Sequence, residues 1–225
     1  MITDEEYQKN IEKCYKEKFL SRTAGYSYQG DIVTKLLYGI ISKFVKSGYI
    51  LDVGAGTGAL VKFLKIKGYE NVCGIDLYPK VDFIEKGEIT RLEFRDAHFS
   101  TVFCTEVIEH LQIEQIMKGL KEIHRVLNKG GYLIITVPCD ENLERDAVVC
   151  PICQHKFHIV GHLQSFSKKI ISELLTQNNF VIQFMKVFPL PIMAKLPLSN
   201  FYWRFLMLLD KRVNFYKNFV IVAKK

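Results

Sequence analysis

The run Tyr-Ile-Leu-Asp-Val-Gly-Ala-Gly-Thr-Gly at residues 49–58 constrains this chain more than any other stretch. Apolar residues around an aspartate, followed by glycine at every second position, predict a buried strand that turns sharply into a helix. The glycines leave the turn without side chains, so its backbone and the first helical amides can lie against a ligand. An ordinary tight turn needs only one or two glycines. The stretch therefore predicts a turn that binds a nucleotide-like molecule.

Two kinds of nucleotide fit this turn. Gly54-x-Gly56-x-x-Ala59 matches the dinucleotide fingerprint, and Asp76 lies at about the expected distance for gripping ribose hydroxyls, so these residues alone allow NAD(P). Asp52 and the third alternating glycine favour another ligand. The pattern Asp-x-Gly-x-Gly-x-Gly resembles motif I of class I S-adenosylmethionine (SAM) methyltransferases.

Two later segments decide between these ligands. Residues 101–105 predict a fourth strand, which leads into Glu-Val-Ile-Glu-His-Leu at residues 106–111. This sequence is similar to a recurring element of small-molecule and lipid SAM methyltransferases and has no counterpart in the dinucleotide fingerprint. Leu-Asn-Lys-Gly-Gly-Tyr-Leu-Ile-Ile-Thr-Val-Pro at residues 127–138 also resembles this family. The resemblance implies an α/β fold with a Rossmann-like, seven-stranded mixed sheet, mostly parallel with an antiparallel last strand, and helices on both faces.

The resemblance also implies where the cofactor SAM binds. The glycine turn would cradle it with support from Asp52, and Asp76 at the end of the second strand would hold the ribose. A third strand over residues 92–95 is expected to end at Asp96, which would bind adenine, while residues 104–106 would border the methionine part. The expected SAM-binding residues are Asp52, Gly54, Ala55, Gly56, Gly58, Asp76, Leu77, Asp96, Ala97, Thr105 and Glu106.

A cysteine- and histidine-rich loop follows the fifth strand. Cys150, Cys153, His158 and His162 offer two thiolates and two imidazoles, the ligand set of a tetrahedral zinc site. Only four residues separate the two pairs, so a bound zinc ion would mainly fix the shape of the loop. The alternative is a loop of reduced cysteines whose histidines face the substrate.

The position of this loop makes its histidines catalytic candidates as well. Loops at the carboxyl ends of sheet strands surround the ligand crevice in open α/β folds. His158 and His162 are therefore candidates either for metal ligands or for a base that takes a proton from a hydroxyl acceptor. A zinc ion that activates a thiol acceptor is a third alternative. His110 is either a further base or, as we favour, a residue that fastens its turn through hydrogen bonds.

The net charge of +7 is concentrated at one end of the chain. Residues 186–225 contain eight Lys and Arg residues against the single acid Asp210, so the preceding 185 residues sum to zero. Within this region, residues 189–217 combine three prolines with many aromatic residues. Such a segment could serve as a lid or dimer contact, lie on an anionic membrane surface, bind a lipid-linked acceptor, or stack on single-stranded RNA.

Length and composition predict one domain over residues 1–225. It would comprise an N-terminal helical cap (1–46), the Cys/His loop (139–166) and the basic aromatic insertion (189–217). Within the cap, a helix over residues 3–19 is expected to cover the cleft, and Arg22 and Tyr26 follow it in a loop.

The sequence also gives an expected cellular location and an expected activity. Six cysteines, four of them scattered singly, an acidic N-terminus and no long apolar run predict a cytoplasmic protein with reduced thiols. The expected function is methyl transfer from SAM to a small-molecule, sugar or lipid-linked acceptor. The alternatives are an RNA or protein methyltransferase and a catalytically silent module that binds SAM and zinc.

Overall fold

The computed structural model describes residues 30–150, 153–190 and 217–225. The expected helix over residues 3–19, Arg22, Tyr26 and most of the basic aromatic insertion lie outside these ranges. The helical elements are α3 (Gly30–Ile41), η1 (Ser42–Phe44), α4 (Ala59–Ile66), η2 (Ile108–His110), α5 (Ile113–Val126) and α6 (Lys168–Gln177). The strands are β1 (Ile50–Val53), β2 (Val72–Asp76), β3 (Glu85–Lys86), β4 (Phe99–Thr105), β5 (Leu127–Pro138), β6 (Ala147–Val149), β7 (Lys156–His158), β8 (Val181–Phe188) and β9 (Asn218–Lys224).

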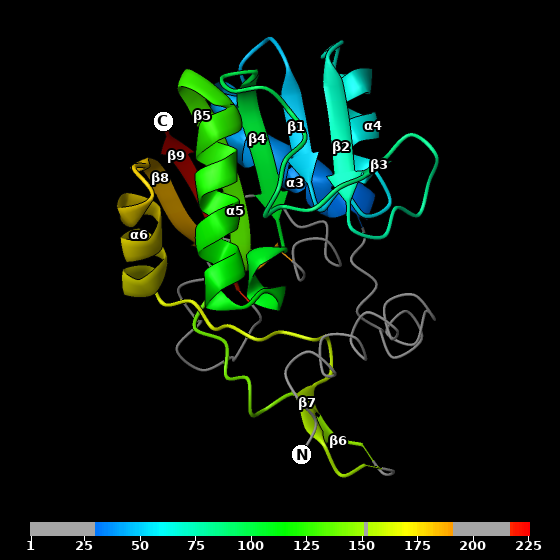
Figure 1. Ribbon diagram of the computed structural model, residues 1–225, viewed down its shortest axis with the longest axis vertical. Coiled ribbons are helices and arrows are strands. Elements are labelled where there is room, and N and C mark those ends of the chain that lie inside the picture. The colour runs from blue at the N-terminus through cyan, green and yellow to red at the C-terminus, as the bar shows by residue number, and fades with distance from the viewer. Residues whose placement is uncertain (1–29, 151–152, 191–216) are drawn as a thin grey trace, which may run out of the picture.

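Seven strands form one mixed sheet in the order β3-β2-β1-β4-β5-β9-β8 (Figure 1). Neighbouring strands from β3 to β5 are parallel, whereas β9 runs antiparallel to both β5 and β8. The carboxyl ends of β1, β4 and β5 therefore meet at one edge. The expected seven-stranded, Rossmann-like fold with a closing antiparallel strand is confirmed.

The sheet is covered on both faces because alternate strand residues point to opposite sides. Leu51 and Val102 pack with α5 and α6 in one apolar cluster, whereas Ile50 and Phe103 pack with α3 and α4 in the other. Figure 1 shows α5 and α6 in front of the sheet and α3 and α4 behind it. All four residues of β1 are buried, as expected of a parallel strand that is covered on both sides.

The third strand predicted over residues 92–95 is wrong, because β3 lies at Glu85–Lys86. Leu92 and Phe94 pack into the core at alternate positions, as strand residues would. Their backbone groups, however, form hydrogen bonds with side chains of α5. The Leu92 amide donates to Glu122 Oε2 (2.8 Å), and the carbonyls of Leu92 and Phe94 accept from Arg125 (2.8 Å each). These contacts use the backbone groups that a sheet ladder would need.

Local hydrogen bonds mark the boundaries of two helices. Gly68 follows α4 with φ +90° and donates to Lys65 O, and the Ser167 side chain caps α6 by accepting from the Ile170 amide (3.3 Å). Residues 128–131 form an irregular start of β5, where the register with β4 shifts. Among the described residues, no helix is both long and apolar enough to span a membrane.

Candidate functional site

The turn between β1 and α4 is held against β2 through its backbone. The amides of Gly54 and Ala55 both donate to Ile75 O (2.9 Å each), and the Gly56 amide donates to Asp76 Oδ2 (2.8 Å). Gly54, Gly56 and Gly58 have φ of +76°, +53° and +72°, values that L side chains rarely adopt. The glycine pattern therefore produces the sharp turn expected of it.

Two of these glycines differ in their surroundings. A methyl group on Gly54 would overlap the side chain of Val107, so Gly54 is required for packing. A methyl group on Gly56 would meet no heavy atom of the described residues within 4 Å. The backbone at Gly56 thus borders open space, and the turn fits a ligand that lies directly on the main chain.

Asp76 stands at the carboxyl end of β2 and faces this turn. Besides the Gly56 amide, its carboxylate accepts from the backbone amide of Tyr78 (2.9 Å). The next residue, Leu77, is 42% exposed. A carboxylate in this position fits the expected grip on ribose hydroxyls.

Asp52 lies inside β1, two residues before the first glycine, and is only 2% exposed. Its Oδ1 has no hydrogen-bond partner among the described residues. Burial, with a smaller contribution from the charge of Asp76, raises the pKa of Asp52 to about 7. A buried carboxyl group without a partner is costly, so it fits a site where a ligand or a proton completes its interactions.

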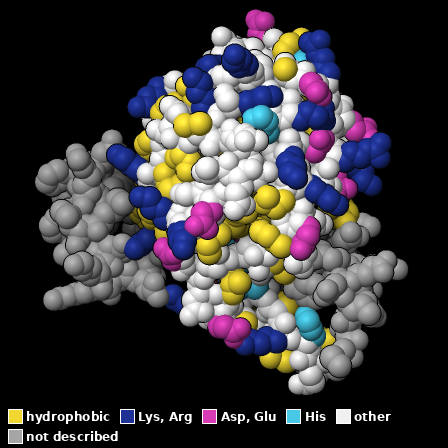
Figure 2. All heavy atoms as spheres, turned by 60° about the vertical axis from the view of Figure 1, so that its left-hand side comes forward, with side chains coloured by type: hydrophobic (Ala, Val, Ile, Leu, Met, Phe, Trp, Pro, Cys, Tyr) yellow, Lys and Arg dark blue, Asp and Glu magenta, His cyan; other side chains and the backbone are white. Residues whose placement is uncertain are grey.

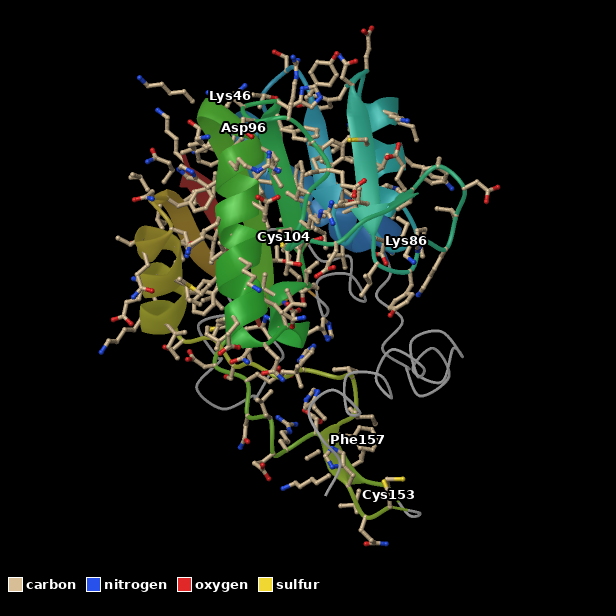
Figure 3. The ribbon with its side chains drawn as sticks, in the orientation of Figure 1. Lys46, Lys86, Asp96, Cys104, Cys153 and Phe157 are labelled. Carbon is tan, nitrogen blue, oxygen red and sulfur yellow. The ribbon has the colours of Figure 1, made fainter. Side chains whose placement is uncertain are left out.

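The structure places Asp96 and Ala97 away from this site. They precede β4 at its amino end, whereas the glycine turn follows the carboxyl end of the parallel β1 (Figure 3). The Asp96 side chain is 77% exposed and forms an ion pair with Arg125 (2.7 Å), whose carbonyl accepts from the Ala97 amide (3.0 Å). The prediction that these two residues end the third strand and bind adenine is therefore corrected. The acidic residue that follows the real β3 is Glu88.

Thr105 ends β4 beside the glycine turn, and Glu106 follows it directly. Glu106 has φ +54°, and both of its carboxylate oxygens are bonded, one by Thr136 Oγ1 (2.6 Å) and one by Asn218 Nδ2 (2.8 Å). Burial raises the pKa of Glu106 against the opposing effect of these hydrogen bonds. A non-glycine residue held in this region marks a backbone that the surroundings constrain, as is common at functional sites.

Beyond Glu106, two acids and three histidines form a cluster that we call the Glu/His cluster: Glu109, His110, Glu141, His158 and His162. His162 Nδ1 lies 2.6 Å from Glu141 Oε2, and His158 Nε2 lies 3.6 Å from the other oxygen of Glu141. The His158 and His162 rings stack with centroids 4.7 Å apart. His110 meets His162 edge to face, with centroids 4.8 Å apart, and its Nδ1 donates to Gly161 O (3.2 Å). The loop histidines thus meet η2 directly.

The electrostatics of this cluster are those of a desolvated site. Burial, strengthened by His162, lowers the pKa of His110 to about 3, so its imidazole is neutral at pH 7 and a weak base. Burial, with the charges of Glu106 and Glu141, raises the pKa of Glu109 well above its usual value. The hydrogen bond to Gly161 is the kind expected if His110 fastens its turn.

The cysteines lie in the hairpin formed by β6 and β7, with Cys153 exposed at its far end (Figure 3). The Cys150 amide donates to His155 O (2.8 Å), which closes the loop. Two groups of the described residues bring three potential metal ligands within 4.8 Å of one another, namely Glu109 with His110 and His162, and Glu141 with His158 and His162. Neither group contains a cysteine, so the predicted set of two cysteines and two histidines is not assembled.

Comparison with known proteins gives the family. A methyltransferase-domain model matches residues 22–183, which is more than half of the chain. The chain belongs to this methyltransferase family. One relative, the demethylmenaquinone methyltransferase of Chlorobaculum tepidum, is 35% identical over 112 residues, which cover 44% of this chain and 43% of the relative. The eEF1A lysine and N-terminal methyltransferase of Bos taurus is 27% identical over 147 residues, or 55% of this chain and 21% of the relative. The matched regions thus span less than half of these two relatives.

Solved structures agree on the fold. The 1,6-didemethyltoxoflavin-N1-methyltransferase of Burkholderia thailandensis, crystallised with S-adenosylhomocysteine, superimposes with a TM-score of 0.67 at 15% identity and covers 100% of this methyltransferase and 91% of its own chain. A SAM-dependent methyltransferase of Methanosarcina mazei gives a TM-score of 0.59 at 21% identity, with 84% and 97% covered. The class I SAM-dependent methyltransferase family and fold predicted from the sequence are confirmed.

Sequence reasoning missed two acids of the cluster. Glu109 stands within the family-like segment at residues 106–111, but the sequence alone gives no reason to separate it from Glu106. Glu141 follows β5 and meets His162 across 21 residues of chain. The only signal for Glu141 was its place after a strand that ends at the crevice.

Proposed function

We propose that this methyltransferase transfers the methyl group of SAM to a small-molecule, sugar or lipid-linked acceptor. The observation that carries the proposal is the open main chain at Gly56, which is bonded to Asp76 at the carboxyl edge of the sheet. Relatives named for a quinone precursor and a toxoflavin precursor support a small acceptor. Other relatives are named for protein or tRNA methylation, so these acceptors are the competing class.

The cofactor supplies a methyl group made electrophilic by a sulfonium centre. The backbone at Gly54, Gly56 and Gly58 would cradle it, and Asp76 would hold the ribose through two carboxylate oxygens. We assign the adenine contact to Glu88 in place of Asp96, because Glu88 follows β3 and the Gly87 amide donates to Asp76 O (3.0 Å). The chain itself positions the two reactants and excludes water, which is what a single in-line displacement requires.

The acceptor would lie between the glycine turn and the Glu/His cluster. Val107 packs against Gly54, so the turn and η2 are adjacent, and residues 161–164 pack back onto η2. The amides of Leu163 and Gln164 both donate to Glu109 O (2.7 and 3.1 Å). An acceptor atom next to Glu106 would then approach the cofactor from the side of the Cys/His loop.

Calorimetric titration with S-adenosylhomocysteine tests the cofactor site. We expect one site per chain, with affinity reduced at least about tenfold in Asp76→Ala, because two hydrogen bonds to a charged group are lost. The matched control is Glu70→Ala, which removes an exposed acid near the amino end of β2. Equal binding by the Asp76→Ala variant would remove the ribose assignment.

A transfer assay with methyl-labelled SAM tests the acceptor class. Extracts separated into small-molecule, lipid, RNA and protein fractions serve as acceptor pools, and label is expected in the small-molecule or lipid fraction. Label confined to RNA or protein would overturn the acceptor proposal. Tight cofactor binding without label in any fraction would favour a silent binding module.

A further inference from the structure

One side chain of the Glu/His cluster has no evident structural purpose. Glu109 is fully buried, and neither of its carboxylate oxygens has a hydrogen-bond partner among the described residues. By contrast, the neighbouring Glu106 is bonded through both oxygens. A buried carboxyl group left in this state costs several kcal/mol unless a proton or a cation compensates it.

The two histidines beside Glu109 are oriented in the way that metal-binding histidines usually are. His110 Nδ1 donates to the carbonyl of Gly161, and His162 Nδ1 is bonded to Glu141 Oε2 at 2.6 Å. A metal-binding imidazole commonly donates one ring N–H to a carbonyl or a carboxylate, which leaves the lone pair on the other nitrogen. Both rings therefore carry the lone pair on Nε2.

We propose that Glu109, His110 and His162 hold a divalent transition-metal ion, with Glu141 and Gly161 as the hydrogen-bond partners that orient the two rings. The three ligand residues bring one ligand atom each within 4.8 Å of one another. Two imidazoles and one carboxylate suit zinc, iron, cobalt or manganese better than magnesium or calcium, which prefer oxygen.

His158 supports this site without being a ligand. Its Nδ1 accepts the backbone amide of His162 (3.3 Å), so the proton lies on Nε2, which faces Glu141 at 3.6 Å. His158 therefore stacks on His162 and lies beside Glu141, which is itself hydrogen-bonded to His162. The second group of potential ligands, Glu141 with His158 and His162, is better explained as this supporting layer.

Three protein ligands leave at least one position of a four- to six-coordinate ion for a water molecule or a substrate oxygen. If the proposed function holds, an acceptor oxygen bound there would lie beside the glycine turn, because Val107 joins η2 to Gly54. The cation would then position the acceptor and favour its deprotonated form. The same histidines would consequently act as ligands and not as the base predicted from the sequence.

Cobalt(II) is the probe for this site. Protein without an affinity tag is stripped with a chelator and titrated with Co²⁺, followed by visible absorption. We expect one Co²⁺ per chain, displaced by Zn²⁺, and a binding constant at least about tenfold weaker in Glu109→Gln and in His162→Asn. Glu114→Gln and His98→Asn, which change an exposed acid of α5 and a histidine at the amino end of β4, are matched controls that should bind like the wild type.

Further variants keep the result interpretable. Cys150→Ser combined with Cys153→Ser is expected to leave Co²⁺ affinity unchanged, and loss of binding only in this pair would overturn the proposal. In metal-free protein, Glu109→Gln is expected to raise the melting temperature, which shows that the variant folds. Absence of saturable Co²⁺ binding by folded wild-type protein would mean that Glu109 simply carries a proton.

Binding of S-adenosylhomocysteine separates this proposal from the proposed function. Metal-free protein that binds S-adenosylhomocysteine but takes up no Co²⁺ refutes only the cation site. Protein that takes up Co²⁺ but does not bind S-adenosylhomocysteine refutes only the cofactor site.

Discussion

Asp52 is a carboxyl group inside a buried strand, and its titration should be visible in the stability of the protein. Its pKa in the folded state is about 7, above the ordinary value of 3.8. The folded state therefore retains a proton that the unfolded chain releases, so this stabilising contribution is full below about pH 4 and is lost as the pH rises to 7.

We therefore expect Asp52→Asn to be more stable than the wild type at pH 8, by up to about 4 kcal/mol, and to show a smaller loss of stability between pH 5 and pH 8. Urea unfolding at the two pH values measures both effects. Asp82→Asn, which changes an exposed aspartate, is the control. An equal loss of stability in the wild type and in Asp52→Asn would contradict the assignment.

Glu88 and Asp96 give a second contrast at the level of single residues. Glu88 follows β3 near Asp76, whereas Asp96 lies at the opposite end of the sheet, paired with Arg125. We expect Glu88→Ala to weaken binding of S-adenosylhomocysteine about three- to tenfold, the effect of losing one hydrogen bond, and Asp96→Ala to leave it unchanged. Calorimetry on both variants decides the matter, and weaker binding in Asp96→Ala alone would restore the original assignment.

At the scale of one element, two substitutions in the turn between β1 and α4 should affect stability and ligand binding to different degrees. Gly54→Ala is expected to destabilise the protein by about 2 kcal/mol or more, because the new methyl group overlaps Val107 at a positive φ. Gly56→Ala adds a methyl group to open space, so only the backbone conformation costs energy, about 1 kcal/mol.

The effects on binding should be in the reverse order to the effects on stability. The methyl group of Gly56→Ala would stand where the ligand lies on the main chain, so S-adenosylhomocysteine affinity should fall by more than about tenfold. Thermal melting and calorimetry on both variants test this, and Gly54→Ala combined with Val107→Ala should recover part of the lost stability. Normal ligand affinity in a folded Gly56→Ala protein would show that the ligand does not lie on this turn.

The same scale explains what could be predicted from the sequence. Elements whose signals are local, such as β1, the end of β2 at Asp76 and the strand β4, were predicted within a residue or two. The third strand failed because the apolar alternation at residues 92–95 serves contacts with α5, while the real β3 is two exposed charged residues with no strand signal. In the candidate site, the sharp glycine turn could be predicted because turn geometry is local. The Glu109 and Glu141 contacts depend on chain segments that only the fold brings together.

At the scale of the molecule, strand order gathers the site. The neighbours β1, β4 and β5 are followed closely by Gly54, Glu106 and Glu141 respectively, so one edge of the sheet carries the glycine turn and the Glu/His cluster. Outside residues 186–225, charge does not gather in the same way. On the face drawn in Figure 2, Lys and Arg side chains are interspersed with acidic ones, and residues 1–185 have no net charge.

This distribution predicts how transfer responds to salt. Binding of a nucleic acid that contacts six to ten phosphates falls by about 10³- to 10⁵-fold between 50 and 200 mM salt. A small or lipid-linked acceptor releases few counterions, so we expect its KM to change by less than about twofold over the same range. Initial rates measured with the active acceptor fraction at both salt concentrations provide the test, with S-adenosylhomocysteine affinity as the control for general salt effects. A steep rise in KM with constant cofactor affinity would instead assign the basic region at residues 186–225 to a polyanionic acceptor, because the rest of the chain carries no net charge to attract one.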